Sequence, residues 1–366
     1  MNFRKFLVGA LCFLALGGSF TACSDDDDVM NDNGSKTELP GRRAYILYEG
    51  NFAPGQPLND TGIAFYAPNN DKEFISNIYK YQNNKELGNL GQAIIEEDGF
   101  IYVTVSSSKS VLKLNEACVE VGRCDFTTES DPRFIVAEGG YLFVSHYGGT
   151  VSKIDPNTMK VVKSFKGGQQ LEGIAECNGK LYVTNGFTPD FSYLQDVFVI
   201  NPQTMALENT IKVADNPKKI IEEEDRLYVL SLGNYGDVQS QLQVIDPRTN
   251  QVTPITPASF MAEGNHDQIL LVQVEYDAAY NPTNKLFSYN AKTQQLNSQS
   301  FLKNPPAELL KGNIYMISVD DDTDEIYIGV TDYKTPGTIY RFDGQGNLKG
   351  SFSAGGLNPN AMIFVD

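Results

Sequence analysis

One phrase recurs five times along this chain: FIYVTVSSS from Phe100, YLFVSHYGG from Tyr141, KLYVTNGFT from Lys180, RLYVLSLGN from Arg226 and EIYIGVTDY from Glu325. Its apolar, β-branched and aromatic residues are typical of a buried β-strand. A repeat of about 40 residues indicates that the chain is built from copies of one small structural unit.

Each phrase has the same kinds of neighbour. An apolar segment and a turn come before it: AIIEEDG ending at Gly99, FIVAEGG at Gly140, GIAECNG at Gly179, KIIEEED at Asp225 and MISVDDDTD at Asp324. A second hairpin comes after it: VSKIDPNTMKVV from Val151, VFVINPQTMALE from Val197 and LQVIDPRTNQVT from Leu242. The Asp/Asn-Pro-x-Thr stretch in that hairpin is typical of a tight turn, because proline fixes the backbone angle that the turn needs. Each unit is therefore predicted to contain four short strands, here called A, B, C and D in chain order.

The number of B strands predicts an all-β fold, a seven-bladed β-propeller of four-stranded antiparallel blades. AYILYEG from Ala44 and ILLVQVEYD from Ile269, the poorest match, raise the number of units from five to seven. The chain starts on a B strand and ends on an A strand, Ala361 to Val365, so the C-terminal strand can pair with the N-terminal blade. That pairing would close the ring without exposed sheet edges.

The repeat resembles the YVTN-repeat surface propellers, from Ala44 to the end of the chain. The resemblance implies a single propeller domain over residues 42–366. It implies no function by itself, because propellers serve as enzymes, sugar binders and scaffolds alike.

The N-terminus resembles a lipoprotein signal. Arg4 and Lys5 precede an apolar run from Phe6 to Leu16, which is too short to span a bilayer as a helix. Ser19-Phe20-Thr21-Ala22-Cys23 then resembles a lipobox, with phenylalanine where leucine is usual. The resemblance implies that residues 1–22 are a cleaved signal peptide. It also implies that Cys23 carries diacylglycerol and an acyl chain such as palmitate, as the only attachment to a membrane.

An acidic run follows the predicted lipidated cysteine directly. Ser24 and Asp25 to Asp28 resemble the export signal that places some Gram-negative lipoproteins on the outer face of the outer membrane. The alternative is a solvated acidic linker that is not an export signal. Val29 to Gly41 is rich in Asn, Asp, Gly and Ser, so residues 23–41 are expected to be the acylated cysteine and a flexible acidic tether.

Composition excludes one class of partner. The formal net charge is −17, and no cluster of Lys and Arg occurs beyond the first few positions. Nucleic-acid binding needs a basic surface that displaces counterions from phosphates, so the sequence predicts no nucleic-acid partner.

The cysteines do not form a disulfide framework. Three remain after the predicted signal and lipidation site: Cys118, Cys124 and Cys177. Cys118 and Cys124 are predicted to lie in one strand, six residues apart, which is too far to bond each other. All three are expected to be buried reduced thiols, and no Cys/His spacing predicts a zinc site.

Catalytic motifs are scarce. The chain has no G-x-S-x-G, G-x-x-x-x-G-K or H-E-x-x-H motif and only two histidines, so we expect a binding protein with no catalytic residues and no catalytic cofactor. The run from Asp320 to Asp324 could ligate Ca²⁺ through its oxygens, but it occupies the position of an A–B turn. The turn is the favoured interpretation, and no metal site is predicted.

Topology predicts where a ligand would bind. In a four-stranded up-and-down blade, the B–C and D–A connections emerge on one face of the ring, here called the loop face. The B–C loops are long and aromatic, and the D–A connections add polar residues that include Gln92, Gln170, Lys218 and Asn358. The candidate ligand-binding residues on this face are Asn51, Phe52, Arg133, His146, Tyr147, Asn185, Phe187, Asn234, Tyr235, His266 and Tyr333. Rigid aromatic and amide side chains suit a large planar or amide-bearing ligand, although aromatic side chains can also simply cap the blades.

The acidic lipoprotein signal and the seven repeats together resemble the BtuG-type surface cobalamin-binding lipoproteins. The resemblance implies a non-enzymatic receptor that captures vitamin B12, or another corrinoid, and passes it to a TonB-dependent outer-membrane transporter. His146 or His266 could serve as an axial cobalt ligand, but an ordinary surface hydrogen bond is the favoured role for both. One alternative is a glycan-binding surface propeller, in which the same aromatic residues stack on sugar rings. The other is a propeller lactonase or lyase with a metal at the central channel.

Overall fold

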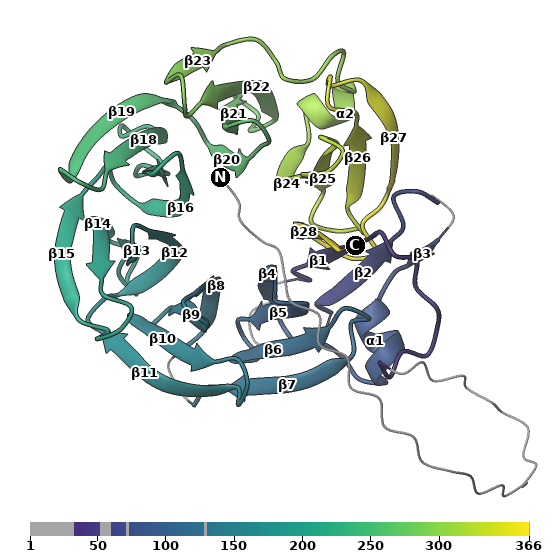
Figure 1. The fold of residues 1–366 in the computed structure, drawn as a ribbon. Helices are drawn as coiled ribbons and strands as arrows, with labels where there is room; N and C mark the ends of the chain where they lie inside the picture. Colours follow the sequence, from purple (N-terminus) through teal and green to yellow (C-terminus); the bar gives the residue numbers. More distant parts are fainter. Residues whose placement is uncertain (1–32, 52–59, 71–72, 128–129, 366) are drawn as a thin grey trace, which may run out of the picture.

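The structure, a computed structural model, describes residues 33–51, 60–70, 73–127 and 130–365. Seven four-stranded antiparallel sheets form a closed ring, which confirms the predicted seven-bladed β-propeller (Figure 1). The predicted signal peptide, Cys23 and the acidic run lie outside the described residues, as does Phe52. Among the described residues, no helix is long and apolar enough to cross a membrane.

The four strands of each blade follow one another from the central channel to the rim. The inner strands are β4 (Gly91–Glu97), β8 (Pro132–Glu138), β12 (Gln170–Cys177), β16 (Pro217–Glu223), β20 (Phe260–Glu263), β24 (Asn313–Val319) and β28 (Pro359–Val365). The second strands are β1 (Arg43–Tyr48), β5 (Phe100–Val105), β9 (Tyr141–His146), β13 (Lys180–Phe187), β17 (Arg226–Ser231), β21 (Gln268–Tyr276) and β25 (Ile326–Thr331). The third strands are β2 (Gly62–Tyr66), β6 (Ser110–Asn115), β10 (Thr150–Asp155), β14 (Tyr193–Ile200), β18 (Gln241–Asp246), β22 (Pro282–Asn290) and β26 (Thr338–Phe342). The outer strands are β3 (Phe74–Ile75), β7 (Glu120–Asp125), β11 (Lys160–Lys166), β15 (Leu207–Lys212), β19 (Gln251–Pro257), β23 (Gln295–Asn297) and β27 (Leu348–Ser353).

The ring closes where the sequence predicts it. The C-terminal strand β28 pairs antiparallel with β1, from Arg43 opposite Val365 to Tyr48 opposite Pro359. The first blade therefore has the order β28-β1-β2-β3, with the two ends of the propeller sequence in one sheet. We number this sheet blade 1 and the others blades 2 to 7 in chain order.

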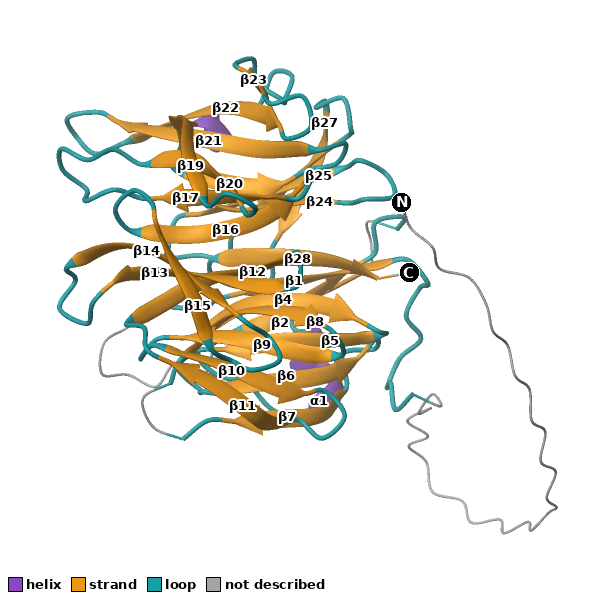
Figure 2. Cartoon of the chain, turned by 60° about the vertical axis from the view of Figure 1, so that its left-hand side comes forward, coloured by secondary structure: helices purple, strands orange, loops and turns teal. Residues whose placement is uncertain are grey.

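The two faces of the propeller differ in the length of their loops. Long hairpin loops such as the β13–β14 and β21–β22 connections extend on one side, to the left in Figure 2, and form the loop face. The short A–B and C–D turns and the end of β28 lie on the other side. The run from Asp320 to Asp324 is one of these A–B turns, between β24 and β25, as its favoured interpretation predicts.

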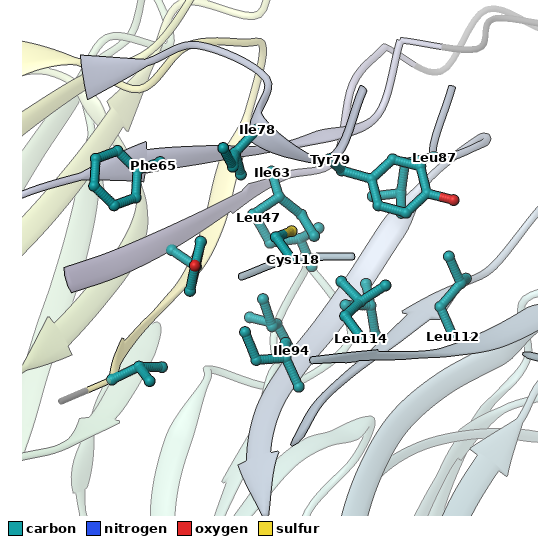
Figure 3. Close-up of a cluster of buried hydrophobic side chains, with 14 of the residues drawn as sticks. Leu47, Ile63, Phe65, Ile78, Tyr79, Leu87, Ile94, Leu112, Leu114 and Cys118 are labelled. Atoms are coloured by element: carbon teal, nitrogen blue, oxygen red, sulfur yellow. The ribbon is translucent and has the colours of Figure 1, made fainter. Parts of the chain in front are cut away.

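A short helix fills the junction between blades 1 and 2. In α1 (Ile78–Asn83), the Asn77 side chain accepts a hydrogen bond from the Lys80 amide at 2.9 Å and so caps the helix. The helix buries Ile78 and Tyr79 in an apolar cluster with residues of both blades (Figure 3). The second helix, α2 (Ala307–Leu310), lies beside blade 6.

Cys118 belongs to the cluster in Figure 3, and its position corrects one prediction. It lies in the turn between β6 and β7 with φ of 63°, whereas Cys124 lies in β7, so the two do not share a strand. The Asn115 side chain makes the turn by accepting hydrogen bonds from the backbone N–H groups of Ala117 and Val119. All three described cysteines are buried and free, and burial raises the pKa of each thiol.

The second half of the expected tether lies against the propeller. Ser35 is buried, and its hydroxyl accepts a hydrogen bond from the Gln82 side chain at 2.7 Å. The backbone N–H of Lys36 donates to the same side chain at 2.9 Å. Ser35 and Lys36 are therefore bound to α1 by polar contacts.

Candidate ligand-binding face

Six of the seven inner strands carry an irregularity near the loop face. At this irregularity, one or two residues of the inner strand have no pairing partner on the second strand. Such an unpaired insertion is a β-bulge. The polar or tyrosine residues at these bulges are Gln92, Arg133, Glu172, Lys218, Tyr315 and Asn360. A bulge changes the direction in which a side chain points, so the repeat places one such residue from each of six blades near the channel mouth. We call these six residues the bulge ring.

Glu172 is the centre of one half of the bulge ring. Its carboxylate is buried and accepts two hydrogen bonds from Arg133, at 3.0 and 3.3 Å, and one from Lys218 at 2.7 Å. The Tyr147 hydroxyl donates to the same carboxylate. Burial alone would raise the pKa of Glu172, but Arg133 and Lys218 hold it well below its usual range. Glu172 is therefore stabilised as an anion, and its contacts link blades 3, 4 and 5.

Glu49, at the end of β1, has the same role in the other half. The Gln92 amide donates to one oxygen of its carboxylate, and the Tyr315 hydroxyl donates to the other. The Asn360 amide donates to the backbone carbonyl of Gly91 at 2.7 Å. These contacts join blades 7, 1 and 2.

Hydroxyl side chains of the second strands hold the bulges in place. Thr104 accepts a hydrogen bond from the Ala93 amide of its own blade at 3.0 Å and donates to the Arg133 carbonyl of the next blade at 2.7 Å. Ser145 and Thr184 make the equivalent donations to the carbonyls of Glu172 and Lys218. All three hydroxyl residues are fully buried. They occupy the same position of the YVTN-like phrase, which thereby positions the ring residue of the following blade.

A line of aromatic side chains runs outward from Glu172. The Arg133 guanidinium lies 4.3 Å from the centre of the Tyr147 ring, and Phe187 packs against Tyr147 at a centroid distance of 5.7 Å. Phe191 stacks on Phe187 in parallel, 5.8 Å between centroids, and is 72% exposed. Tyr147, Phe187 and Phe191 together are called the aromatic ladder. It forms a continuous line of aromatic contacts that connects solvent with the bulge ring.

Blade 6 interrupts the ring. Its inner strand β20 pairs with β21 continuously from Phe260 to Glu263, without a bulge, and is only four residues long. A cavity of about 620 Å³ lies on the loop face between blades 5 and 7. Tyr235, Tyr276 and Tyr333 are among its lining residues.

The two histidines do not take part in the bulge ring. His146 ends β9 with its side chain fully buried against Phe126, at a ring distance of 4.6 Å, and burial lowers its pKa to about 3. His266 lies in the β20–β21 turn, 3.1 Å from Asp324. The prediction that His266 lies on the loop face is therefore wrong, because the short blade 6 shifts the strand boundaries. Neither side chain is placed to ligate a cobalt ion on the loop face.

The asparagines among the predicted ligand-binding residues mainly form hydrogen bonds that stabilise nearby loops. The Asn185 side chain is buried and accepts a hydrogen bond from the backbone of Gln169 at 2.9 Å. The Asn234 side chain accepts two backbone hydrogen bonds within its own loop. Asn51 is exposed beside Glu49. These residues shape the loops around the ring and the cavity.

Of the predicted residues, Arg133 and Tyr147 therefore contact Glu172, and Phe187 packs on Tyr147. Tyr235 and Tyr333 line the cavity. The repeat pattern does not single out five further residues of this face: Glu172, Tyr315, Phe191, Tyr276 and Tyr280. Glu172 could have been found by aligning it with Gln92, Arg133 and Lys218, because it lies in the equivalent bulge, between Leu171 and Ile174.

One acidic cluster could hold a metal ion among the described residues. Ligand atoms of Glu223, Glu224 and Asp267 lie within 4.8 Å of one another. The Lys292 ammonium, 3.7 Å from Glu224 and 3.8 Å from Asp267, already supplies a positive charge there. The cluster lies at the A–B turns of blades 5 and 6, on the face opposite the loop face.

Comparisons with known proteins support the fold. No model of a known protein family matches the chain, and neither does any curated protein sequence. Among solved structures, the computationally designed Ika8 protein is similar with a TM-score of 0.55 and 10% identity, over 86% of this chain and 88% of that one. Hydrazine synthase of Kuenenia stuttgartiensis is similar with a TM-score of 0.55 and 16% identity, over 67% and 73%. The Pan2 WD40 domain of Neurospora crassa is similar with a TM-score of 0.51 and 10% identity, over 71% and 80%. At these identities the likeness defines the protein as a β-propeller and assigns no function.

Proposed function

We propose that this protein is a lipid-anchored receptor on the outer-membrane surface that captures cobalamin or another corrinoid. It binds its ligand on the loop face without catalysis and hands it to a TonB-dependent outer-membrane transporter. The observation that carries the ligand class is the aromatic ladder, which ends in the exposed ring of Phe191 and leads to the bulge ring.

A corrinoid matches this surface in shape and in hydrogen bonding. Its broad flat ring can stack on the exposed ring of Phe191, which packs in parallel on Phe187. The amides around its edge can reach polar side chains at the channel mouth. Two groups there are available. The Lys218 side chain is 37% exposed, and the Asn360 Oδ1 acceptor is buried without a hydrogen-bond partner among the described residues. An amide N–H of the ligand would satisfy that acceptor.

The proposed location on the cell surface is based on the N-terminal sequence. The lipobox-like segment ending at Cys23 supports an acyl anchor, and Asp25 to Asp28 support export to the cell surface. Labelling cells with radioactive palmitate tests the anchor: we expect label on the natural protein and none on a Cys23→Ala variant. Protease treatment of intact cells tests the surface location, and protection of the protein would contradict it.

Calorimetry with cyanocobalamin tests the ligand. We expect one binding site, and we expect Phe191→Ala and Phe187→Ala each to weaken binding by about tenfold or more. Phe191→Ala removes the exposed stacking ring, and Phe187→Ala removes the ring on which Phe191 packs. Leu207→Ala is the matched control, since this exposed side chain lies on the outer strand β15, away from the loop face. If the protein releases no heat and retains no colour after gel filtration, the corrinoid proposal is wrong.

A further inference from the structure

The cavity on blade 6 has an unusual lining. None of the described residues that line it is charged, although charged residues make up 20% of the chain and the net charge is −17. Its volume of about 620 Å³ lies within the range of about 300 to 1,000 Å³ that is typical of small-molecule sites. An uncharged lining favours an uncharged ligand, because a buried ion would find no counter-charge there.

Exposed tyrosines gather at the cavity. Tyr235, Tyr276, Tyr280 and Tyr333 all line it, and their exposed fractions are 74%, 62%, 84% and 50%. Tyr235, Tyr280 and Tyr333 come from the B–C loops of blades 5, 6 and 7, and Tyr276 ends β21, so three blades contribute to one rim. Tyrosine rings offer a flat apolar face together with a hydroxyl group, which suits a ring that is apolar on its faces and polar at its edge.

Two buried acceptors at the wall lack donors. The Asn284 amide donates to the carbonyls of Leu309 and Gly312 at 2.9 and 2.8 Å, and these bonds fix its orientation. Its Oδ1 atom then has no hydrogen-bond partner among the described residues, and the same holds for Oε1 of Gln273. A buried acceptor without a donor is costly, so a ligand that supplies O–H or N–H donors would gain from filling this space.

The remaining polar groups of the lining are also uncharged. Ser240 of blade 5 and Ser259 of blade 6 have their hydroxyl oxygens 3.3 Å apart, and Gln239 and Asn313 contribute amides. Hydroxyl and amide groups can both donate and accept, so they match a ligand whose hydroxyl groups do the same.

We propose that this cavity binds one ring of a neutral carbohydrate, with the adjoining sugar units lying on the exposed tyrosines of the rim. A sugar ring is uncharged, presents C–H groups on its faces for the tyrosines, and carries O–H donors for the acceptors of Asn284 and Gln273. The cavity shares no lining residue with the aromatic ladder, so the inference does not depend on the proposed capture of a corrinoid. A surface receptor with such a site would bind neutral glycans as a second ligand class.

Tyrosine fluorescence provides the test, because the chain contains no tryptophan. The purified protein would be titrated with neutral hexasaccharides of glucose, mannose and galactose, and with sulfated forms of the same sugars. We expect at least one neutral hexasaccharide to change the fluorescence saturably, and its sulfated form to bind at least about tenfold more weakly, because the cavity offers no positive charge.

Two variants locate the site. Tyr276→Ala removes an exposed ring of the rim, and Gln273→Leu removes an acceptor at nearly constant volume. Each is expected to weaken sugar binding by about tenfold. Phe191→Ala is the matched control, an exposed aromatic of the same face outside the cavity, and should bind the sugar normally. Conversely, Tyr276→Ala should leave cyanocobalamin binding unchanged, which separates the two proposals. The inference is overturned if no neutral hexasaccharide binds, or if one binds equally well to Tyr276→Ala and Gln273→Leu.

Discussion

At the scale of single residues, Glu172 and His146 show two ways in which the propeller accommodates a buried ionisable group. Glu172 stays charged because Arg133, Lys218 and Tyr147 surround its carboxylate with donors. His146 is buried against Phe126 with a pKa lowered to about 3, and so remains neutral. The first group links three blades, and the second makes stability depend on pH.

Replacing Glu172 by glutamine should destabilise the protein strongly. The variant leaves the buried Arg133 guanidinium without its anion, and loss of one partner of a buried ion pair costs about 3 to 5 kcal/mol. Urea unfolding measures the change. Glu275→Gln is the control, because the Glu275–Lys285 pair is exposed and such pairs are worth at most about 1 kcal/mol. Equal stability of the two variants would show that the Glu172 network does not support the fold.

His146 should make the protein less stable in acid. The unfolded chain takes up a proton near the ordinary pKa of 6.5, whereas the folded state resists protonation until about pH 3. The free energy of unfolding therefore keeps its full value above pH 6.5 as far as His146 is concerned. Below pH 6.5 it falls by about 1.4 kcal/mol per pH unit, because only the unfolded chain binds the proton. Unfolding free energies of the natural protein and of His146→Leu, measured between pH 7 and pH 4, should differ by this slope. Parallel curves would mean that the imidazole is not kept neutral.

At the scale of elements, the second strand of one blade fixes the inner strand of the next. Thr104, Ser145 and Thr184 each place a buried hydroxyl where the following bulge presents a backbone carbonyl. Blade-to-blade packing therefore depends on polar contacts near the loop face as well as on the apolar clusters between sheets. The same contacts hold the backbone of Arg133, Glu172 and Lys218.

Thr104→Val tests this interblade contact. Valine keeps the shape of threonine but leaves the Ala93 amide and the Arg133 carbonyl without the hydroxyl, so we expect a loss of about 1 to 3 kcal/mol in unfolding free energy. Thr210→Val on the exposed outer strand β15 should change stability by less than about 0.5 kcal/mol. A Thr104→Val variant as stable as Thr210→Val would show that the hydroxyl contact contributes nothing.

At the scale of the whole molecule, the propeller is closed by pairing the two ends of its repeat sequence. Strand β28 supplies the inner strand of blade 1, and its neighbour Asn358 bonds both Thr331 and the Gly50 carbonyl. A ring closed in this way has no unpaired inner edge at the junction. Every blade then packs against two neighbours.

Removing residues 358–366 should abolish cooperative unfolding. The truncated chain lacks the inner strand of blade 1, so β1 loses half of its backbone pairing and the junctions with blades 2 and 7 open. Thermal denaturation followed by circular dichroism and limited proteolysis would detect the loss. A chain that lacks residues 1–32 should unfold like the natural protein, and a normal transition in the C-terminal truncation would contradict the closure.

The repeat phrases predicted the number of blades, the strand order and the closure, because each depends on local alternation of residues and on chain connectivity. They also predicted that Arg133, Tyr147 and Phe187 share a face. His266 was misplaced because blade 6 has a four-residue inner strand and a longer hairpin, which no sequence period describes. Cys118 was misplaced because Asn115 makes a turn with its side chain where the pattern suggested a strand.

The sequence by itself therefore determined the seven-bladed ring and its loop face, since both follow from a repeated local pattern. Only the tertiary structure decided which loop-face residues act together. A β-bulge depends on the pairing between neighbouring strands, so the bulge ring around Glu49 and Glu172 appears only when the strands are paired. The uncharged cavity likewise exists because three blades meet around a shortened inner strand, and no single repeat contains that arrangement.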